Sequence, residues 1–225
     1  MMKKNVIFDM DGVLFDTERL AIRCWDAIGP QCGLGPVGHM VYQTLGRTRE
    51  ESERIFRETY GERYDSAQFQ RLYRAWLNDY YRTHPVPVKE GLYSLLDTLK
   101  DKGYRLAVAS SSSREAVTHH LNNAGITGYF DSIVSGEMAA RSKPEPDIYL
   151  AAAASLGAAP GDCYAVEDSR SGLWAAHRAG CFTVMIPDIW ECDDETGIIT
   201  DCVFRSLSDF ETYIHTIHNA MTEAL

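Results

Sequence analysis

Short apolar runs alternate with amphipathic stretches over most of the chain. The first run, Val6-Ile7-Phe8, is uninterrupted and consists of β-branched and aromatic residues, which is typical of a strand buried on both faces. Strands that alternate with helices indicate βαβ units, so we predict an α/β fold with a doubly wound parallel sheet. The predicted strands cover residues 6–8, 105–109, 132–134, 163–166, 182–186 and 202–204. The predicted helices between them cover about 89–102 and 114–124, run from Pro146 to Gly157 and up to Gly180, and begin again near Asp209.

One segment, residues 17–85, breaks the alternation because its pattern is helical throughout. Capping signatures at Thr48 and Asp65 open two of its helices. The last helix carries an aromatic stripe that is typical of a core face. This stripe consists of Phe69, Leu72, Tyr73, Trp76 and Tyr80. We therefore predict a core domain of residues 1–16 and 86–225, with 17–85 inserted as a compact all-helical domain.

Two acids, Asp9 and Asp11, follow the first predicted strand, and Gly12 allows a sharp turn after them. Ligands of open α/β sheets bind outside the carboxyl ends of the strands. Two carboxylates at that place repel each other unless they share a cation. The pair therefore indicates either a divalent metal site or a carboxylate nucleophile beside a carboxyl acid/base. An Asp-Gly turn and a helix cap at Asp16 are the structural alternatives, and an EF-hand is excluded because Leu14 stands where its glycine is required.

Three more polar clusters follow predicted strands. Ser110 stands at a strand end, where its hydroxyl and the free N–H groups of the next helix can hold a phosphate; Ser112 is predicted to cap that helix in a capping box. Lys143 lies in a proline-fixed loop and can neutralise a phosphate and a carboxylate together. Glu167 and Asp168 end an apolar strand and suit Mg²⁺, which prefers oxygen ligands. Taken singly, each cluster also fits an ordinary turn, a surface lysine or a helix cap.

Read together, these clusters resemble the motifs of the haloacid dehalogenase-like hydrolase superfamily. The matching stretches are Asp9 to Glu18, the strand that ends at Ser110, Ser142-Lys143-Pro144, and Glu167-Asp168-Ser169 with Gly172. The helical insert resembles the cap of the group that contains phosphoglycolate-type phosphatases and beta-phosphoglucomutase. The resemblance implies a Rossmann-like core with an inserted helical cap domain.

The resemblance also implies roles for individual residues. Asp9 is expected to be the nucleophile that becomes an aspartyl-phosphate, and Asp11 the general acid and then base. Ser110 and the backbone N–H of Ser111 are expected to hold the phosphoryl group, while Lys143 steadies that group and the nucleophile. A carboxylate can attack phosphorus in this way, provided that cations and donors spread the phosphoryl charge.

The cofactor implied by the resemblance is Mg²⁺. Its expected ligands are Asp9, the backbone carbonyl of Asp11, and Asp168, with Glu167 helping through water. An acid at Asp11 argues against the dehalogenase and phosphonate-cleaving branches, which lack an Asp at this place.

The predicted substrate depends on the insert. The loop with Gly46, Arg47 and Arg49 resembles the cap loop of beta-phosphoglucomutase, and these residues are expected to bind substrate; Arg49 fits a surface arginine equally well. The mutase has a histidine at the place of Ala21 and a lysine at that of Leu77. We therefore predict a Mg²⁺-dependent phosphatase of a small phosphorylated metabolite, such as a sugar phosphate. The alternatives are a phosphosugar mutase of the beta-phosphoglucomutase type and a non-catalytic phospho-ligand binding module.

Composition narrows the expected partners and location. The net charge of −10 argues against nucleic acid, and no apolar run approaches the ~20 residues of a membrane helix. The first residues do not have the pattern of a signal peptide. The six cysteines have no zinc-like spacing, and three of them (Cys24, Cys163 and Cys181) lie in apolar patterns, so we expect reduced, mostly buried thiols. We expect a cytoplasmic monomer whose partner is its metabolite.

Overall fold

The computed structural model describes residues 3–45, 47 and 49–222, and the chain divides into two compact units. The first, which we name the core unit, is Met1–Phe15 with Val88–Leu225. The second, the helical unit, is Asp16–Pro87. Within the described residues, no helix has the length and apolar character that a membrane span needs.

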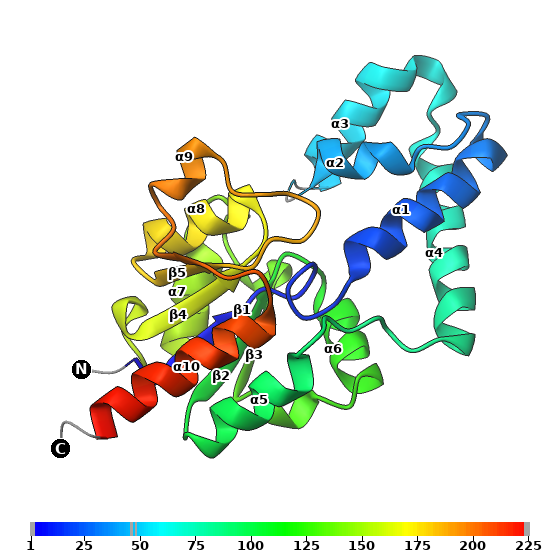
Figure 1. The fold of residues 1–225 in the computed structure, drawn as a ribbon. Helices are drawn as coiled ribbons and strands as arrows, with labels where there is room; N and C mark the ends of the chain where they lie inside the picture. Colours follow the sequence, from blue (N-terminus) through cyan, green and yellow to red (C-terminus); the bar gives the residue numbers. More distant parts are fainter. Residues whose placement is uncertain (1–2, 46, 48, 223–225) are drawn as a thin grey trace. The chain divides into compact units, whose positions relative to one another are not determined.

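The core unit is built on a six-stranded parallel sheet in the order β3-β2-β1-β4-β5-β6 (Figure 1). This arrangement confirms the predicted α/β fold. The chain builds the sheet outward from β1 through β2 to β3, then returns to the other side of β1 with β4. The order therefore reverses between β1 and β4, and such a switch point is where α/β sheets bind ligands. The strands are β1 Asn5–Phe8, β2 Arg105–Ser110, β3 Ser132–Ser135, β4 Cys163–Glu167, β5 Phe182–Met185 and β6 Cys202–Val203.

Helices cover both faces of this sheet. Helices α7 and α8 pack together on one face, where alanines allow close approach to the strands, and α5 and α10 pack together on the other (Figure 1). The core-unit helices are α5 Leu92–Asp101, α6 Arg114–Asn123, α7 Asp147–Ser155, α8 Arg170–Ala179, α9 Asp194–Gly197 and α10 Leu207–Thr222. Short 3₁₀ turns lie at Thr127–Tyr129, Gly136–Met138 and Pro160–Asp162.

The start of α5 and the capping residue of α6 differ from the prediction. Helix α5 begins at Leu92 rather than near residue 89, because Gly91 precedes it with a φ of +83°, outside the helical region. Helix α6 is capped by Ser113, whose side chain accepts a hydrogen bond from the N–H of Ala116. The predicted capping box on Ser112 is therefore wrong by one residue. Helix α9 was not predicted because it is a single short turn.

The helical unit packs around aromatic side chains. Its helices are α1 Thr17–Ile28, α2 Val41–Thr44, α3 Arg49–Tyr60 and α4 Ser66–Thr83, with 3₁₀ turns at Gly29–Cys32, Gly38–Met40 and Gly61–Arg63. Phe56 and Phe69 are buried at its centre, and Trp25 packs edge-on against both. The predicted stripe on α4 follows this core through Trp76, whereas Tyr80 stacks between Trp76 and His84 outside the buried cluster.

The chain enters and leaves the helical unit through paired segments. Phe15 and Val88 form an antiparallel bridge, and the N–H of Lys89 donates to the carbonyl of Leu14 at 3.0 Å. The N–H of Asp16 donates to the carbonyl of Pro87 at 2.8 Å. The two connections thus run side by side.

All six cysteines are free thiols, and the buried ones are Cys24, Cys163 and Cys181. These are the three that lie in apolar sequence patterns, so burial is confirmed for them, whereas Cys32, Cys192 and Cys202 are partly exposed. Burial raises the pKa of Cys24 and of Cys181 to about 12, which keeps both thiols protonated and unreactive.

Candidate active site

Lys143 gathers the ends of three strands into one buried cluster. Its Nζ donates to Asp9 Oδ1 at 2.5 Å, to Glu167 Oε1 at 2.6 Å and to the carbonyl of Ala109 at 3.2 Å. Asp9 follows β1, Ala109 lies near the end of β2, and Glu167 ends β4. Because the three strands are parallel neighbours, their carboxyl ends meet at this edge of the sheet. Lys143 is 6% exposed, and each of the three N–H groups of its ammonium has one of these acceptors.

The buried charges of this cluster do not balance. Asp9, Glu167 and Asp168 are buried with Lys143 as their buried cation. Burial raises the pKa of Asp9 to about 8, with Glu167 and Asp11 adding to the rise and Lys143 opposing it. The charges of Asp9 and Glu167 in turn raise the pKa of Lys143 against the effect of its burial, so it stays an ammonium. The excess of negative charge is what a bound cation would neutralise.

The residues present fit a divalent metal ion. One carboxylate oxygen from each of Asp9, Glu167 and Asp168 lies within 4.8 Å of the others. Gly12, at φ +84°, allows this closeness, since a Cβ there would come within 2.0 Å of Asp168 Oδ2. Such hard oxygen donors suit Mg²⁺. A buried acidic cluster of this kind can hold the metal that the sequence predicts.

Glu167 is the anchor of the cluster. Its side chain is fully buried, and its Oε1 accepts hydrogen bonds from Lys143 and from the hydroxyl of Tyr149. Its Oε2 accepts from the backbone of Asp168 and from the backbone and hydroxyl of Ser169. Gly172 makes room for it, because a Cβ at that position would lie 1.9 Å from the carboxylate. Both oxygens are thus engaged by protein donors, and the predicted water-mediated role at a metal stays a prediction.

The serine run after β2 contacts the second acid. Ser112 Oγ donates to Asp11 Oδ2 at 2.9 Å, and the N–H of Ser112 donates to Ser110 Oγ at 3.1 Å. Ser110 is buried at the strand end, whereas Ser111 is exposed. Since Ser113 caps the helix, the hydroxyl of Ser112 is available to orient Asp11. The predicted phosphate-holding roles of Ser110 and Ser111 stay predictions.

The family described as haloacid dehalogenase-like hydrolase matches residues 6–186, a span that includes every residue of this cluster. The chain belongs to the haloacid dehalogenase-like hydrolases. The family named from the sequence motifs is thereby confirmed, and the cluster around Lys143 is the candidate active site of this hydrolase.

Among the relatives of this haloacid dehalogenase-like hydrolase are both a mutase and a phosphatase. Beta-phosphoglucomutase of Bacillus subtilis (strain 168) is 35% identical and aligns over 92% of this chain and 91% of its own. Hexitol phosphatase A of Escherichia coli (strain K12) is 30% identical over 83% of this chain and 84% of its own. A mutant of CbbY from Rhodobacter sphaeroides, solved with xylulose 1,5-bisphosphate, has a TM-score of 0.77 and 27% identity, covering 92% of this chain and 96% of that one.

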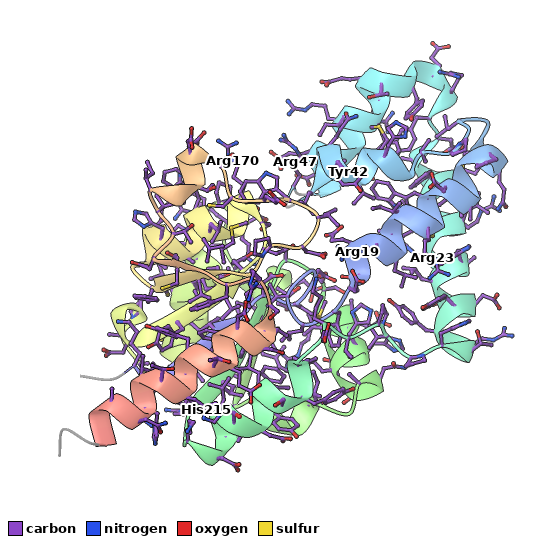
Figure 2. The ribbon with its side chains drawn as sticks, viewed as in Figure 1. Arg19, Arg23, Tyr42, Arg47, Arg170 and His215 are labelled. Atoms are coloured by element: carbon purple, nitrogen blue, oxygen red, sulfur yellow. The ribbon has the colours of Figure 1, made fainter. Side chains whose placement is uncertain are left out.

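The predicted substrate contacts of this hydrolase lie in the helical unit. Arg47 is exposed, and its Nε donates to the carbonyl of Gln43 at 2.9 Å (Figure 2). Gly46 and the side chain of Arg49 lie outside the described residues. The substrate-binding roles of these three residues therefore stay predictions.

A clamp on α8 borders the cluster. Arg170 is the first residue of α8, the helix that follows Asp168 and Ser169. Its guanidinium pairs with Asp193 at 3.4 Å and with Glu195, both of which come after β5 in the chain (Figure 2). These ion pairs connect the start of α8 to the segment that contains α9.

Sequence reasoning missed two residues of the cluster. Ser112 was assigned to a helix cap because Glu115 stands three residues after it, at the spacing of a capping box. Tyr149 lies on α7 among apolar residues and has the pattern of a core position. The signal in the sequence was a tyrosine in an alanine-rich helix. A buried tyrosine hydroxyl generally has a hydrogen-bond partner, so it could have indicated a polar group beside this face of the helix.

Proposed function

We propose that this protein is a Mg²⁺-dependent phosphatase that hydrolyses a small phosphorylated metabolite, such as a sugar phosphate, through an aspartyl-phosphate on Asp9. The observation that carries the proposal is the contact of 2.5 Å between the Lys143 ammonium and Asp9 Oδ1 at the switch point of the sheet. A buried carboxylate held against a cation, beside an acidic cluster, is suited to attack on a phosphoryl group.

The reaction has two steps. Asp9 attacks the phosphorus, the bond between phosphorus and the leaving oxygen breaks, and Asp11 gives that oxygen its proton. Asp11 then takes a proton from a water molecule, which attacks the same phosphorus, releases inorganic phosphate and restores the Asp9 carboxylate. Ser110 and the N–H of Ser111 hold the phosphoryl oxygens, and Lys143 balances their charge.

Mg²⁺, held by Asp9, Asp168 and the carbonyl of Asp11, would supply the further positive charge that phosphoryl transfer requires. Ser112 assists by donating its hydroxyl hydrogen bond to Asp11 Oδ2, which orients this acid for proton transfer. Lys143 and Ser112 thus order the two acids before substrate arrives.

A phosphosugar mutase is the second candidate, favoured by the 35% identity to a beta-phosphoglucomutase. A mutase must return the phosphoryl group to a turned intermediate before water reaches the aspartyl-phosphate. Ala21 and Leu77 offer no charge or hydrogen bond for holding such an intermediate. Their apolar side chains favour the phosphatase.

The test is a screen of phosphorylated metabolites with Mg²⁺, in which inorganic phosphate and rearranged sugar phosphate are followed in one reaction. With β-glucose 1-phosphate and a trace of the 1,6-bisphosphate, we expect phosphate release without accumulation of glucose 6-phosphate. Glucose 6-phosphate formed much faster than phosphate would establish the mutase instead.

Asp9→Asn provides the control for the chemistry. It keeps the shape of the side chain and removes the attacking charge, so turnover is expected to fall by about a thousandfold or more. Binding of a phosphorylated metabolite without any turnover by the wild-type protein would favour the binding module.

A further inference from the structure

Among the described residues, Tyr149 is the largest fully buried side chain, yet it carries a hydroxyl into the cluster around Lys143. It lies in the first turn of α7, and its neighbours on the buried face are apolar, such as Ile148, Ala152 and Ala153. The hydroxyl donates to Glu167 Oε1 at 2.5 Å. Burial, followed by the charge of Glu167, raises the pKa of Tyr149 well above its usual range, so the group is a neutral donor.

The hydroxyl shares its acceptor with the catalytic lysine. Glu167 Oε1 accepts from Tyr149 and from Lys143, and Lys143 continues to Asp9 Oδ1. The ring of Tyr149 also lies beneath the ammonium, with its centroid 5.2 Å from Lys143 Nζ. Tyr149 therefore contacts the lysine directly through its ring and indirectly through Glu167.

Lys143 lies between two carboxylates, and its position depends on how strongly each attracts it. A hydrogen bond from a neutral donor stabilises part of the negative charge on Glu167 Oε1 and so weakens the pull of this oxygen on the ammonium. Without that donor, the full charge of this buried oxygen would act on the ammonium and draw it away from Asp9. Among the described residues, the donors to Oε1 are Tyr149 and Lys143 itself, so removing the hydroxyl leaves the ammonium alone on this oxygen.

We propose that Tyr149 is a positioning residue that holds Lys143 against the nucleophile Asp9 by sharing the carboxylate of Glu167. This assignment rests on the proposed phosphatase function. It concerns the hydroxyl, and the ring supplies a separate support for the ammonium.

The competing explanation is purely structural: the hydroxyl satisfies a buried carboxylate and has no effect on the chemistry. Both explanations expect Tyr149→Phe to lower the thermal midpoint, since a buried acceptor loses a donor. They differ in catalysis, because only misplacement of Lys143 lowers turnover in protein that is fully folded.

Tyr164→Phe is the matched control. Tyr164 is 4% exposed and lies on β4, the same strand as Glu167, where the two-residue period puts its side chain on the opposite face of the sheet. It packs there against Phe182, Phe210 and Tyr213, away from Lys143. Both variants exchange one buried tyrosine for phenylalanine and keep the ring.

Hydrolysis of p-nitrophenyl phosphate, or of the best substrate of the metabolite screen, is measured with Mg²⁺ at 25 °C for the three proteins. Thermal unfolding verifies that each is folded. For Tyr149→Phe we expect kcat about tenfold lower, since small misplacements of catalytic groups cost factors of this order. Calorimetric titration with inorganic phosphate in Mg²⁺ is expected to show severalfold weaker binding. Tyr164→Phe should stay within about twofold of wild type in both measurements.

Wild-type kinetics and phosphate affinity in Tyr149→Phe would overturn the assignment and leave the phosphatase function standing. Equal losses in both tyrosine variants would also overturn it, because a general effect of stability would then suffice. Absence of wild-type turnover on every phosphomonoester would instead overturn the proposed function, and this assignment with it.

Discussion

The core unit and the helical unit bury different kinds of side chain. The core unit buries charged residues at the carboxyl edge of its sheet, where Asp9, Lys143, Glu167 and Asp168 contact one another. In the helical unit, the buried Thr44 satisfies its polar side chain locally, because its hydroxyl donates to the carbonyl of Met40 one turn earlier. Its arginines extend from the surface instead, as Arg19 and Arg23 do on α1 (Figure 2).

Under the proposed function, this difference assigns the chemistry to the core unit and the choice of substrate to the helical unit. Burying a charged side chain costs folding free energy unless the charge is paired, so clusters of buried charges are typical of functional sites. Exposed arginines carry little cost, so they can be exchanged without disturbing a core. We therefore expect changes in the core cluster to affect stability and turnover together, and changes at the surface of the helical unit to affect substrate affinity alone.

The largest stability effect is expected for Lys143→Met. It leaves Asp9 and Glu167 buried without their cation, and breaking a buried pair of this kind costs about 3–5 kcal/mol. Arg54→Met in the helical unit is the control, because Arg54 and Glu58 form an exposed pair at 3.9 Å, a type that contributes about 0–1 kcal/mol. Urea unfolding measures both. Similar losses would abolish the distinction between the units.

The second prediction concerns pH in the metal-free protein. Burial raises the folded-state pKa of Asp9 from 3.8 to about 8. Between these two pH values the folded chain therefore retains a proton on Asp9 that the unfolded chain has lost. Its contribution to stability therefore falls as pH rises through this window. Asp9→Asn should unfold at a higher temperature than wild type at pH 8 in chelator, and the difference should shrink toward pH 4.

The exposed Asp79 of the helical unit is the control for this measurement. Asp79→Asn should show a difference from wild type that is nearly constant over the same pH range. A constant difference for Asp9→Asn as well would contradict the raised pKa.

Smaller effects are expected for the adjacent serines Ser112 and Ser113, where one substitution should lower turnover and the other should lower stability. Ser112→Ala removes the hydrogen bond to Asp11, and we expect kcat to fall about tenfold, within the range of a lost positioning of an acid/base group. Ser113→Ala removes a helix cap and should cost about 1 kcal/mol of stability with kcat unchanged. Steady-state kinetics and urea unfolding of the pair are the measurement. A loss of stability in Ser112→Ala and a loss of kcat in Ser113→Ala would instead indicate that Ser112 is the helix cap.

The smallest effect is expected for Arg47→Ala in the helical unit. Its side chain is exposed, so stability should be unchanged, while KM for a sugar phosphate is expected to rise severalfold with kcat preserved. Kinetics on the best substrate of the screen decide this. A fall in kcat with constant KM would contradict a role of Arg47 in substrate affinity, because that is the effect expected for residues of the core cluster.

The strands and the order of the site motifs could be predicted because each rests on local sequence. A buried parallel strand is a continuous apolar run, and an acid or serine that follows it marks the carboxyl edge. The partners of those side chains could not be predicted in the same way. Lys143 and Asp9 are 134 positions apart, and a shift of one residue in a helix cap decides whether Ser112 contacts Asp11.

The hydroxyl of Tyr149 was hidden for a related reason. Helical spacing identifies a buried face, but the element packed against that face is set by the sheet order. The strand that brings Glu167 to this hydroxyl begins after α7 has ended. Sequence periodicity therefore marked the position as core without indicating its acceptor.

The paired connections at Phe15 and Val88 have a consequence for protein engineering. Because the outgoing and returning segments are hydrogen-bonded neighbours, residues 17–86 occupy the place of a hairpin loop. A tight turn, or another domain with adjacent termini, could be grafted there without changing the register of any strand. The core unit can thus be redesigned in a modular way, by exchanging one contiguous piece of chain.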